Sequence, residues 1–283
     1  ELEKTLGARI VDVDYSNVDS LVAQLQDNNV HTLVSTLGGR SPPEQEHALI
    51  QAADRSSVTQ HYIPSVWGVK SRPEVSWSPV AAPKLAIFEA LEKTQLEWTL
   101  VANGFFLDYW GMPKSKSYLS QAILALDVAA NKAAIPGTGD TPITFTYSGD
   151  VTKFTAKLLT LDKWEPESYI ISDRLTWNEI VKLKFDVTYD PTDLLRSGKI
   201  TKLPSHVYVY KFLPKEALQG MPTQFGLLLA EGVLDFHPEQ SLNDLFQLAF
   251  MQDETVVPFD LENLFGRLGL DLGDRSGERA EWL

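Results

Sequence analysis

The feature that most constrains the fold is the alternation of short apolar runs with helix-forming segments over the first 110 residues. The apolar runs predict strands at residues 8–13, 31–37, 59–64 and 97–101. The segments between them predict helices at residues 18–26, 43–54 and 84–93. Strands that are apolar along their whole length are typical of parallel sheets covered by helices on both faces. The sequence therefore predicts an α/β fold with a doubly wound parallel sheet.

The chain changes character after Trp110. We expect a mostly helical stretch at residues 117–134, strands at 143–147 and 168–172, and helices at 151–161 and 175–183. Residues 188–195 are rich in aspartate and proline and predict a looser section, and the helices and loops after residue 217 predict a cap over the sheet edge. These changes predict one α/β domain at residues 1–172 and a smaller domain at residues 173–283.

Local signals mark turns and helix starts in this later part of the chain. Gly137 and Gly139 precede a predicted strand and indicate a hairpin turn. Asp150 precedes a predicted helix and is most simply its N-cap. Thr176 and Glu179 have the Thr-x-x-Glu spacing of a capping box, in which two residues satisfy each other's backbone amides.

Composition excludes several classes of function. The chain carries Lys+Arg 25 against Asp+Glu 38, a net charge of −13, whereas nucleic acids and anionic membranes bind basic surfaces. No apolar run approaches the roughly 20 residues of a membrane span, and the first residues do not resemble a signal peptide. The absence of cysteine excludes disulfides and thiolate chemistry, and the five histidines show no metal spacing. We therefore expect a cytoplasmic monomer or homodimer with no metal, nucleic-acid or membrane partner.

Polar and small residues follow the predicted strands at their carboxyl ends, where open α/β sheets bind ligands. Asp14 and Tyr15 follow the first strand; they either hold the adenine ring of a ligand or only form a turn. Ser65 follows the third strand, and either faces a ligand or caps the next turn. After the fourth strand come Asn103, Gly104 and Phe105, of which the glycine permits close approach to a ligand ring.

Lys84 is the main candidate for chemistry. In the predicted helix, positions 84, 87, 88 and 91 share one face, which is apolar except for the lysine. A lysine there is either desolvated, which lowers its pKa towards the range useful for acid–base work, or it snorkels to solvent. The aromatic residues near the same strand ends either stack on a flat substrate or belong to the core. They include Trp67, Phe106 and Tyr109.

One element of a dinucleotide-binding fold is missing from the sequence. Such folds begin with a strand, a Gly-x-Gly-x-x-Gly turn and a helix, because the glycines let backbone amides approach the pyrophosphate. Gly38 and Gly39 follow a strand but lack this spacing. Either the first portion of the fold lies outside this sequence or the cofactor site is incomplete, and we expect the former.

Six segments, in order, resemble the NmrA-like and isoflavone reductase-like family of atypical short-chain dehydrogenases, in particular its fungal members. They are residues 7–15, 34–38, 63–68, 84–106, 135–151 and 175–179. The resemblance implies a Rossmann-like domain that binds NADP, with NAD as the alternative, and a C-terminal domain that binds substrate. It also implies that Lys84, at the start of its helix, assists hydride transfer.

The resemblance assigns roles to the candidate residues. Those expected to bind the cofactor are Asp14, Tyr15, Thr36, Leu37, Gly38, Pro64, Ser65, Lys84, Asn103, Gly104 and Phe105. Those expected to bind substrate are Trp67, Phe106 and Tyr109. The chain departs from the family at Val66, where relatives have a glutamate, in the absent basic residue that favours NADP, and near Leu183, where we expect residues to be missing.

The leading hypothesis is an NADPH-dependent reductase of a small, aromatic or polyketide-like secondary metabolite, in which Lys84 donates a proton or stabilises an oxyanion. The rival is a redox-sensing regulator that binds the dinucleotide without turnover, as Val66 and the missing glycine turn suggest. A third hypothesis is a cofactor-independent isomerase or cyclase on the same fold.

Overall fold

The computed structural model describes residues 2–38, 41–68, 71–112, 114–182, 185–209 and 215–236. The chain forms two compact units that are interleaved along the sequence. Unit 1 consists of Glu1–Ser65, Pro83–Leu100 and Trp164–Pro166. Unit 2 consists of Val66–Ala82, Val101–Lys163 and the described residues from Glu167 onward. The chain thus enters each unit more than once, whereas the sequence suggested one boundary after residue 172.

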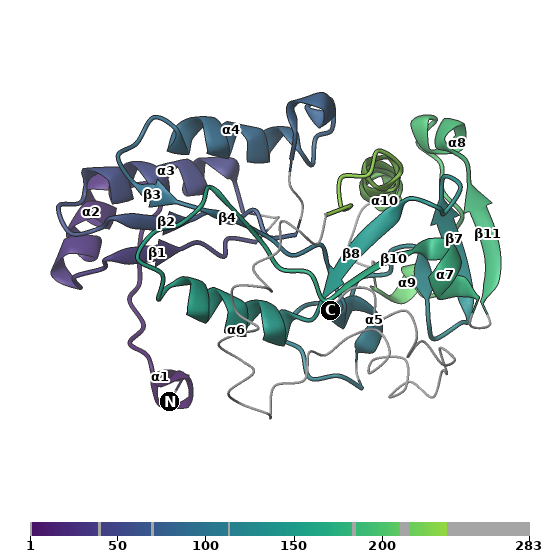
Figure 1. Cartoon of the computed structure of the whole chain (residues 1–283), viewed down its shortest axis with the longest axis horizontal. Helices are drawn as coiled ribbons and strands as arrows, with labels where there is room; N and C mark the ends of the chain where they lie inside the picture. Colours follow the sequence, from purple (N-terminus) through teal and green to yellow (C-terminus); the bar gives the residue numbers. More distant parts are fainter. Residues whose placement is uncertain are drawn as a thin grey trace. The chain divides into compact units, whose positions relative to one another are not determined.

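Unit 1 is a parallel sheet flanked by helices (Figure 1). Its elements are α1 (Leu2–Leu6), α2 (Val18–Asp27), β1 (Thr32–Val34), α3 (Pro43–Arg55), β2 (His61–Ile63), α4 (Ala82–Leu91) and β3 (Glu97–Trp98). The strand order is β1-β2-β3, with Thr32 opposite His61 and Tyr62 opposite Trp98. This arrangement confirms the predicted α/β class.

Local sequence explains where the two helices beside β1 begin and which face they bury. Asn17 caps α2, because its Oδ1 accepts the N–H of Ser20 at 3.0 Å. Pro43 occupies the start of α3, where its missing N–H costs nothing. Leu21 and Leu25 form the buried stripe of α2, which packs against α3.

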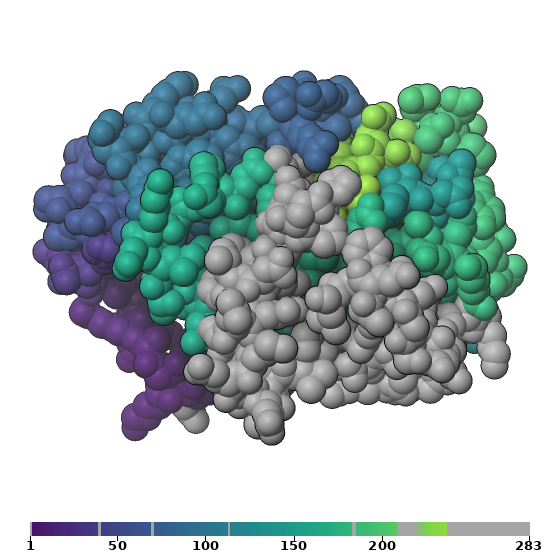
Figure 2. All heavy atoms as spheres, in the orientation of Figure 1, coloured from purple at the N-terminus to yellow at the C-terminus, as the bar shows by residue number. Residues whose placement is uncertain are grey.

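The strand predicted at residues 8–13 is wrong. This segment joins no ladder among the described strands, and the N–H of Ile10 donates instead to the Glu3 carboxylate at 2.8 Å. Alternating or apolar sequence becomes a strand only when a neighbour supplies hydrogen-bonding partners. The preceding helix α1 is exposed along its whole length (Figure 2).

The strand predicted at residues 97–101 is divided in two. β3 ends at Trp98, and β4 (Leu100–Ala102) follows after Thr99. The break arises because the chain changes its hydrogen-bonding partner: Thr99 N–H donates to Tyr62 O at 3.3 Å, but Leu100 N–H donates to Pro166 O at 3.0 Å. One apolar run thus serves two different ladders.

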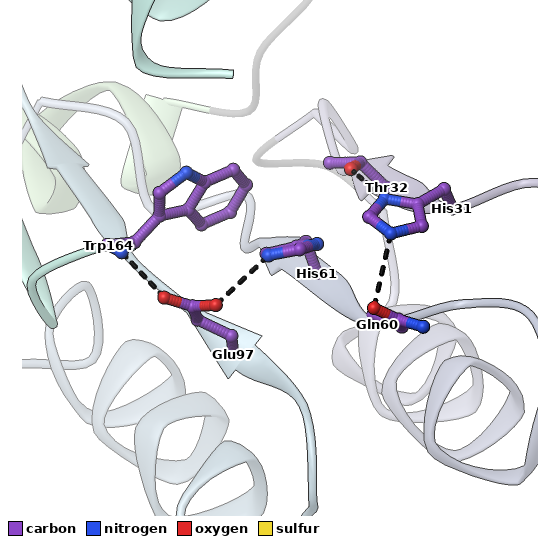
Figure 3. A network of polar contacts seen from close by, with 6 residues as sticks. All are labelled: His31, Thr32, Gln60, His61, Glu97 and Trp164. Atoms are coloured by element: carbon purple, nitrogen blue, oxygen red, sulfur yellow. Dashed lines mark hydrogen bonds and ion pairs between the residues drawn. The ribbon is translucent and has the colours of Figure 1, made fainter. Parts of the chain in front are cut away.

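A polar network joins the strands of unit 1 where they begin (Figure 3). Glu97 Oε2 lies 3.0 Å from His61 Nε2, and Glu97 Oε1 accepts the backbone N–H of Trp164 at 2.6 Å. The His61 ring packs against the rings of His31 and Trp164, each with its centroid 4.8 Å away. These contacts fasten the starting edge of the sheet, which is opposite the edge where its strands end.

Unit 2 is built around small sheets of mixed direction. The elements after β4 are β5 (Phe105–Phe106), α5 (Asp108–Gly111), β6 (Leu126–Asp127), β7 (Lys132–Pro136), β8 (Pro142–Thr146), α6 (Ser148–Leu158), β9 (Glu167–Tyr169), β10 (Asp173–Thr176), α7 (Trp177–Val181), β11 (Asp186–Asp190), α8 (Thr192–Arg196), α9 (His206–Val209) and α10 (Lys215–Ala230); a short 3₁₀ turn, η1 (Pro73–Val75), precedes α4. β8 lies between β10 and β5, β7 lies between β11 and β6, and β4 pairs with β9.

Aromatic rings fill the core of unit 2. Trp110 lies edge-on to Phe145 and Trp177, with centroids 5.6 and 5.8 Å away. Phe105 packs against the same three rings and against Phe225 of α10. Edge-to-face packing of this kind stabilises an interior beyond the area that the rings bury. The cluster therefore joins β5, β8 and three helices into one core.

The helix predicted at residues 117–134 is wrong. Most of this stretch is irregular, and its end forms β6 and β7. Ala133 and Ala134 favour a helix by intrinsic preference, but both pair with β11, opposite Val187 and Thr188. Pairing in a sheet therefore overrides the local preference.

Three further predictions on local structure are wrong. Gly137 does not close a hairpin, because β7 and β8 belong to different sheets and its N–H donates to Asp190 O at 2.8 Å. Residues 188–195 are not loose, since they complete β11 and form most of α8. Asp150 is not an N-cap: α6 already begins at Ser148, and the buried Asp150 carboxylate binds Lys153 at 3.0 Å.

The capping box is confirmed. Thr176 Oγ1 accepts the N–H of Glu179 at 3.1 Å, and Glu179 Oε2 accepts the N–H of Thr176 at 2.7 Å. The helix that it starts is α7, which begins at Trp177 rather than at residue 175 because Leu175 and Thr176 belong to β10. The cap predicted after residue 217 stays a prediction: residues 217–230 belong to helix α10, and the chain beyond residue 236, including His237, lies outside the described residues.

His206 is buried in unit 2, where its ring contacts the backbone of two separate segments. Its Nδ1 accepts the N–H of Leu203 at 3.3 Å, so the ring proton is on Nε2, which lies 3.2 Å from the carbonyl of Ile123. Burial lowers the pKa of His206 below 6.5, while Asp127 and the Ile123 carbonyl oppose this shift. Folding therefore disfavours protonation of this imidazole.

We expect His206 to make folding sensitive to mild acid. Below about pH 6.5 the unfolded chain protonates this histidine more readily than the folded chain, so the free energy of unfolding should fall as the pH decreases. Urea unfolding between about pH 7.5 and about pH 5.5 measures the slope, which should be shallower for His206→Gln. His47→Gln is the control, because this histidine of α3 is only half-buried; its slope should match that of the parent chain. Equal slopes for the His206 variant and the parent chain would contradict this account.

Candidate functional site

A buried carboxylate organises the edge where the strands of unit 1 end. Glu46 of α3 is 3% exposed. Its Oε2 accepts the Ser35 hydroxyl at 2.6 Å, directly after β1, and its Oε1 accepts the Tyr62 hydroxyl at 2.9 Å. Oε1 also accepts the N–H of Ser65 at 3.1 Å, beyond the end of β2. One side chain thus holds two strand ends, and burial of the Tyr62 hydroxyl beside this carboxylate raises the pKa of Tyr62 well above its usual range.

Sequence reasoning did not single out Glu46, although a signal was present. Positions 46, 50 and 53 lie on one face of α3, and Ile50 and Ala53 are buried there. A carboxylate on an apolar helix face is rarely buried unless it is hydrogen-bonded. The same reasoning that selected Lys84 would therefore have selected Glu46.

Ser65 braces the loops after β1 and β2. Its hydroxyl donates to Leu37 O at 2.7 Å, and its N–H is bound to Glu46. The exposed residues of the loop after β1 are Thr36 and Gly38, while Leu37 is half-buried and Pro64 is buried. A Cβ at Gly38 would meet no atom of the described residues within 4 Å, so this part of the protein leaves space for a ligand there. The loop after β1 therefore offers a ligand the main chain at Gly38 and the exposed Thr36.

Lys84 lies in the first turn of α4, which begins at Ala82. Because β2, α4 and β3 form a parallel βαβ unit, the start of α4 lies toward the edge where β2 ends. The residue as a whole is half-buried, but desolvation of the ammonium lowers the pKa of Lys84 to about 8. Among the described residues, no carboxylate pairs with it. An uncompensated ammonium of this kind is a candidate proton donor.

Asp14 has a local structural role. The hydroxyl of Ser16 donates to Asp14 Oδ1 at 2.7 Å and its N–H does so at 2.9 Å, and these bonds lower the pKa of the carboxyl. The turn leads directly into the Asn17 cap of α2. Asp14 is exposed and Tyr15 is half-buried. A role for either in holding adenine stays a prediction.

Two glycine turns of unit 2 are locked together. Gly104 N–H donates to Gly68 O at 3.1 Å, and both residues have positive φ, +68° and +98°. A Cβ on Gly104 would overlap the carbonyl of Thr144. Beside it, Asn103 is fully buried, and its Oδ1 has no hydrogen-bond partner among the described residues. Glycine is required at this turn, and the neighbouring amide oxygen is left for another donor.

The predicted aromatic residues divide between core and surface. The ring of Phe105 is 4% exposed and belongs to the aromatic core of unit 2, so it offers a ligand no free face. Phe106 and Tyr109 are half-buried and contact each other edge-on with centroids 6.1 Å apart. Trp67 is also half-buried, whereas Val66 is fully buried. Phe106, Tyr109 and Trp67 remain the candidates for stacking on a substrate.

The described residues fit a bound dinucleotide in two respects. The backbone is open at Gly38, as a phosphate-bearing ligand requires, and the Lys84 ammonium has no counter-charge within the described part of the protein. A cluster of three or more metal-ligating side chains is not found in the part of the chain that the structure describes. Within that part, the helices are also too short or too polar to cross a bilayer.

Comparison with known proteins gives consistent results. Residues 1–122 match a family described as NAD(P)H-binding. The oxidoreductase BOA1 of Botryotinia fuckeliana is 30% identical over 221 residues, which cover 74% of this chain and 72% of that protein. The fold resembles leucoanthocyanidin reductase of Vitis vinifera in its NADPH complex (TM-score 0.61, 16% identity, 89% of this chain and 83% of that chain). It also resembles an isoflavone reductase (TM-score 0.63, 16% identity, 90% and 80%).

The glycine turn at residue 104 should not tolerate a side chain. Gly104→Ala combines a positive φ with overlap on Thr144, and should lower the free energy of unfolding by about 3 kcal/mol or more. Gly220→Ala is the matched control, because this helical glycine is exposed and its Cβ would meet nothing within 4 Å. Denaturant unfolding should find the control unchanged or more stable by about 1 kcal/mol. Equal effects of the two substitutions would show that the turn is not rigid.

Proposed function

This chain belongs to the NmrA-like and isoflavone reductase-like family of NAD(P)H-binding oxidoreductases, and on that premise we propose that it is a cytoplasmic, NADPH-dependent reductase. Its substrate is a small, aromatic or polyketide-like secondary metabolite. The preference for NADPH over NADH is supported by the NADPH complex of the leucoanthocyanidin reductase with the same fold. NADH is the alternative that the binding experiment below distinguishes.

The observation on which the proposal rests is the desolvated ammonium of Lys84. Burial lowers its pKa to about 8, so the group is still largely protonated at neutral pH but releases a proton more easily than an ordinary lysine. When bound, the cofactor supplies a hydride. Lys84 Nζ then supplies the proton, or the positive charge, that a developing oxyanion needs.

Each unit, taken by itself, offers further groups for the proposed ligands. In unit 1, the loop at residues 36–38 binds the dinucleotide through its backbone groups. Pro64 and Ser65 support that loop, because the Ser65 hydroxyl and N–H are already bound to Leu37 and Glu46. In unit 2, the turn at Asn103 and Gly104 contributes an amide oxygen without a partner among the described residues. Phe106 and Tyr109 offer half-buried rings for an aromatic substrate.

One observation favours a second candidate function. Val66 is 0% exposed, so the position at which the resembled family has a glutamate is part of an apolar interior here. Valine in place of glutamate would not impair a regulator that binds NAD(P)H and signals to a partner protein without turnover. Tight binding of NADPH without its consumption by any carbonyl or enone substrate would favour the regulator.

Substitution of Lys84 should separate chemistry from binding. Lys84→Ala should lower turnover by about 10²- to 10⁴-fold, the usual contribution of a positioned acid, with the Kd for NADPH changed only a few-fold. Calorimetric titration with NADPH and NADH gives the affinities, and NADPH absorbance with a panel of aromatic ketones and enones gives turnover. Lys93→Ala, exposed just beyond the same helix, is the control and should retain full activity. Full activity of Lys84→Ala would remove the lysine from the mechanism.

The pH dependence should report the same group. An acid must be protonated to act, so kcat should fall as the pH rises through about 8. Lys84→Arg keeps the charge but cannot release a proton near neutrality. If proton donation matters, this variant should be slow at every pH. An active Lys84→Arg enzyme without the alkaline decline would reduce the role of Lys84 to electrostatic stabilisation.

A further inference from the structure

We propose that Glu46 is a positioning residue for the cofactor: its buried carboxylate fixes the loops after β1 and β2 in the form that binds the dinucleotide. This inference rests on the proposed function, since it concerns the same ligand. Glu46 itself is 3% exposed and lies beneath the edge, so it acts through the loops rather than by touching the ligand. It was not among the residues that the sequence suggested.

The geometry gives Glu46 control over both loops. Its three hydrogen bonds come from three places along the chain: Ser35 at the end of β1, Tyr62 within β2 and Ser65 beyond β2. Ser65 then transmits the constraint, because its hydroxyl donates to Leu37 O at 2.7 Å in the loop after β1. Each loop is therefore anchored to the carboxylate at its first residues.

A carboxylate suits this role better than other side chains. It only accepts hydrogen bonds, and it has room for several donors at once. The 2.6 Å separation between Ser35 Oγ and Glu46 Oε2 is in the range of charge-assisted bonds, which are shorter and stronger than neutral ones. No Lys or Arg pairs with Glu46 among the described residues, so hydroxyl and amide donors alone stabilise it there. Any movement of a loop would leave a buried charge with fewer donors.

The exposed part of the edge has no comparable anchor among the described residues. A Cβ at Gly38 would meet no atom within 4 Å, and Thr36 is exposed. Loops with few contacts open locally at low cost in free energy. A ligand that binds through backbone groups loses affinity by the fraction of molecules in which those groups are misplaced. Removal of Glu46 should therefore weaken cofactor binding without removing any group that contacts it.

Glu97 provides a matched control within the same unit. It is also a carboxylate that joins segments of the sheet by accepting hydrogen bonds, from His61 and from the backbone of Trp164 (Figure 3). It lies at the edge where the strands begin, whereas Glu46 lies where they end. A general loss of stability should follow from either substitution, but a loss of cofactor affinity should follow only from that of Glu46.

The experiment compares Glu46→Ala, Glu46→Gln and Glu97→Ala in the full chain. We expect Glu46→Ala to raise the Kd for NADPH at least tenfold. Glu97→Ala should change this Kd less than twofold, even if the two variants have the same thermal stability. Glu46→Gln should recover most of the affinity, because the amide oxygen can keep Tyr62 and Ser65 while the Ser35 hydroxyl turns to accept from the NH₂. Ser35→Ala, which removes one donor, serves if Glu46→Ala does not fold, and should raise the Kd several-fold.

Amide hydrogen exchange without cofactor tests the positioning role independently of the proposed function. Exchange at residues 36–38 and at Ser65 should be faster in the Glu46 and Ser35 variants than in the parent chain, and unchanged in Glu97→Ala. The inference would be overturned if exchange at these residues were unchanged. It would also be overturned if the Glu46 and Glu97 variants lost affinity for NADPH in the same proportion to their loss of thermal stability. A parent chain that binds neither NADPH nor NADH would overturn the proposed function, while the exchange data would still decide whether Glu46 orders the loops.

Discussion

Hydrogen bonds to buried carboxylates hold this protein together at the places where the chain must turn. In unit 2, Asp108 is 0% exposed and accepts both the N–H and the hydroxyl of Ser148, at 2.9 and 2.6 Å, together with the hydroxyl of Ser117 at 2.6 Å. The same pairing of one aspartate with both donors of one hydroxyl residue recurs at Asp127 with Ser205 and at Asp190 with Thr201. Glu46 serves the sheet of unit 1 in the same way.

These carboxylates specify loop geometry because a buried charge is costly when it loses its donors. Asp127 and Ser205 are 78 positions apart in the chain, and Asp108 and Ser148 are 40 apart. Each pair therefore fixes which two segments of the chain lie side by side, which hydrophobic burial alone would not specify. The aromatic core around Trp110 provides cohesion, and the carboxylates determine which loops meet.

Lys84 shows the opposite arrangement. The buried acids have donors, but the ammonium of Lys84 has no carboxylate partner among the described residues, and its pKa falls to about 8. A desolvated ammonium without a counter-charge is typical of a functional site, where stability is given up for reactivity. Within unit 1, Glu46 and Lys84 thus differ in their surroundings: three donors bind the Glu46 carboxylate, whereas no described carboxylate binds the Lys84 ammonium.

The sequence alone determined the features that depend on neighbours a few positions away. The periodicity of residues 18–26 and 43–54 predicted α2 and α3, the apolar runs predicted the parallel strands of unit 1, and Thr176 with Glu179 predicted the start of α7. Lys84 could also be selected, because an ion on an apolar helix face is visible within one helix. The resemblance to the family depended on the order of such local segments.

Only the tertiary structure decided features whose partners are distant. Ala133 and Ala134 became strand because β11 pairs with them, and residues 8–13 did not, because they lack such a partner among the described strands. Phe105 could not be assigned to the core before the rings from four other elements surrounded it. The apolar helix face around Glu46 is visible in the sequence, but only the tertiary structure showed that Ser35, Tyr62 and Ser65 are its hydrogen-bond donors. Periodicity reports which face of an element is apolar, but the groups that meet there are chosen by chain folding over long separations.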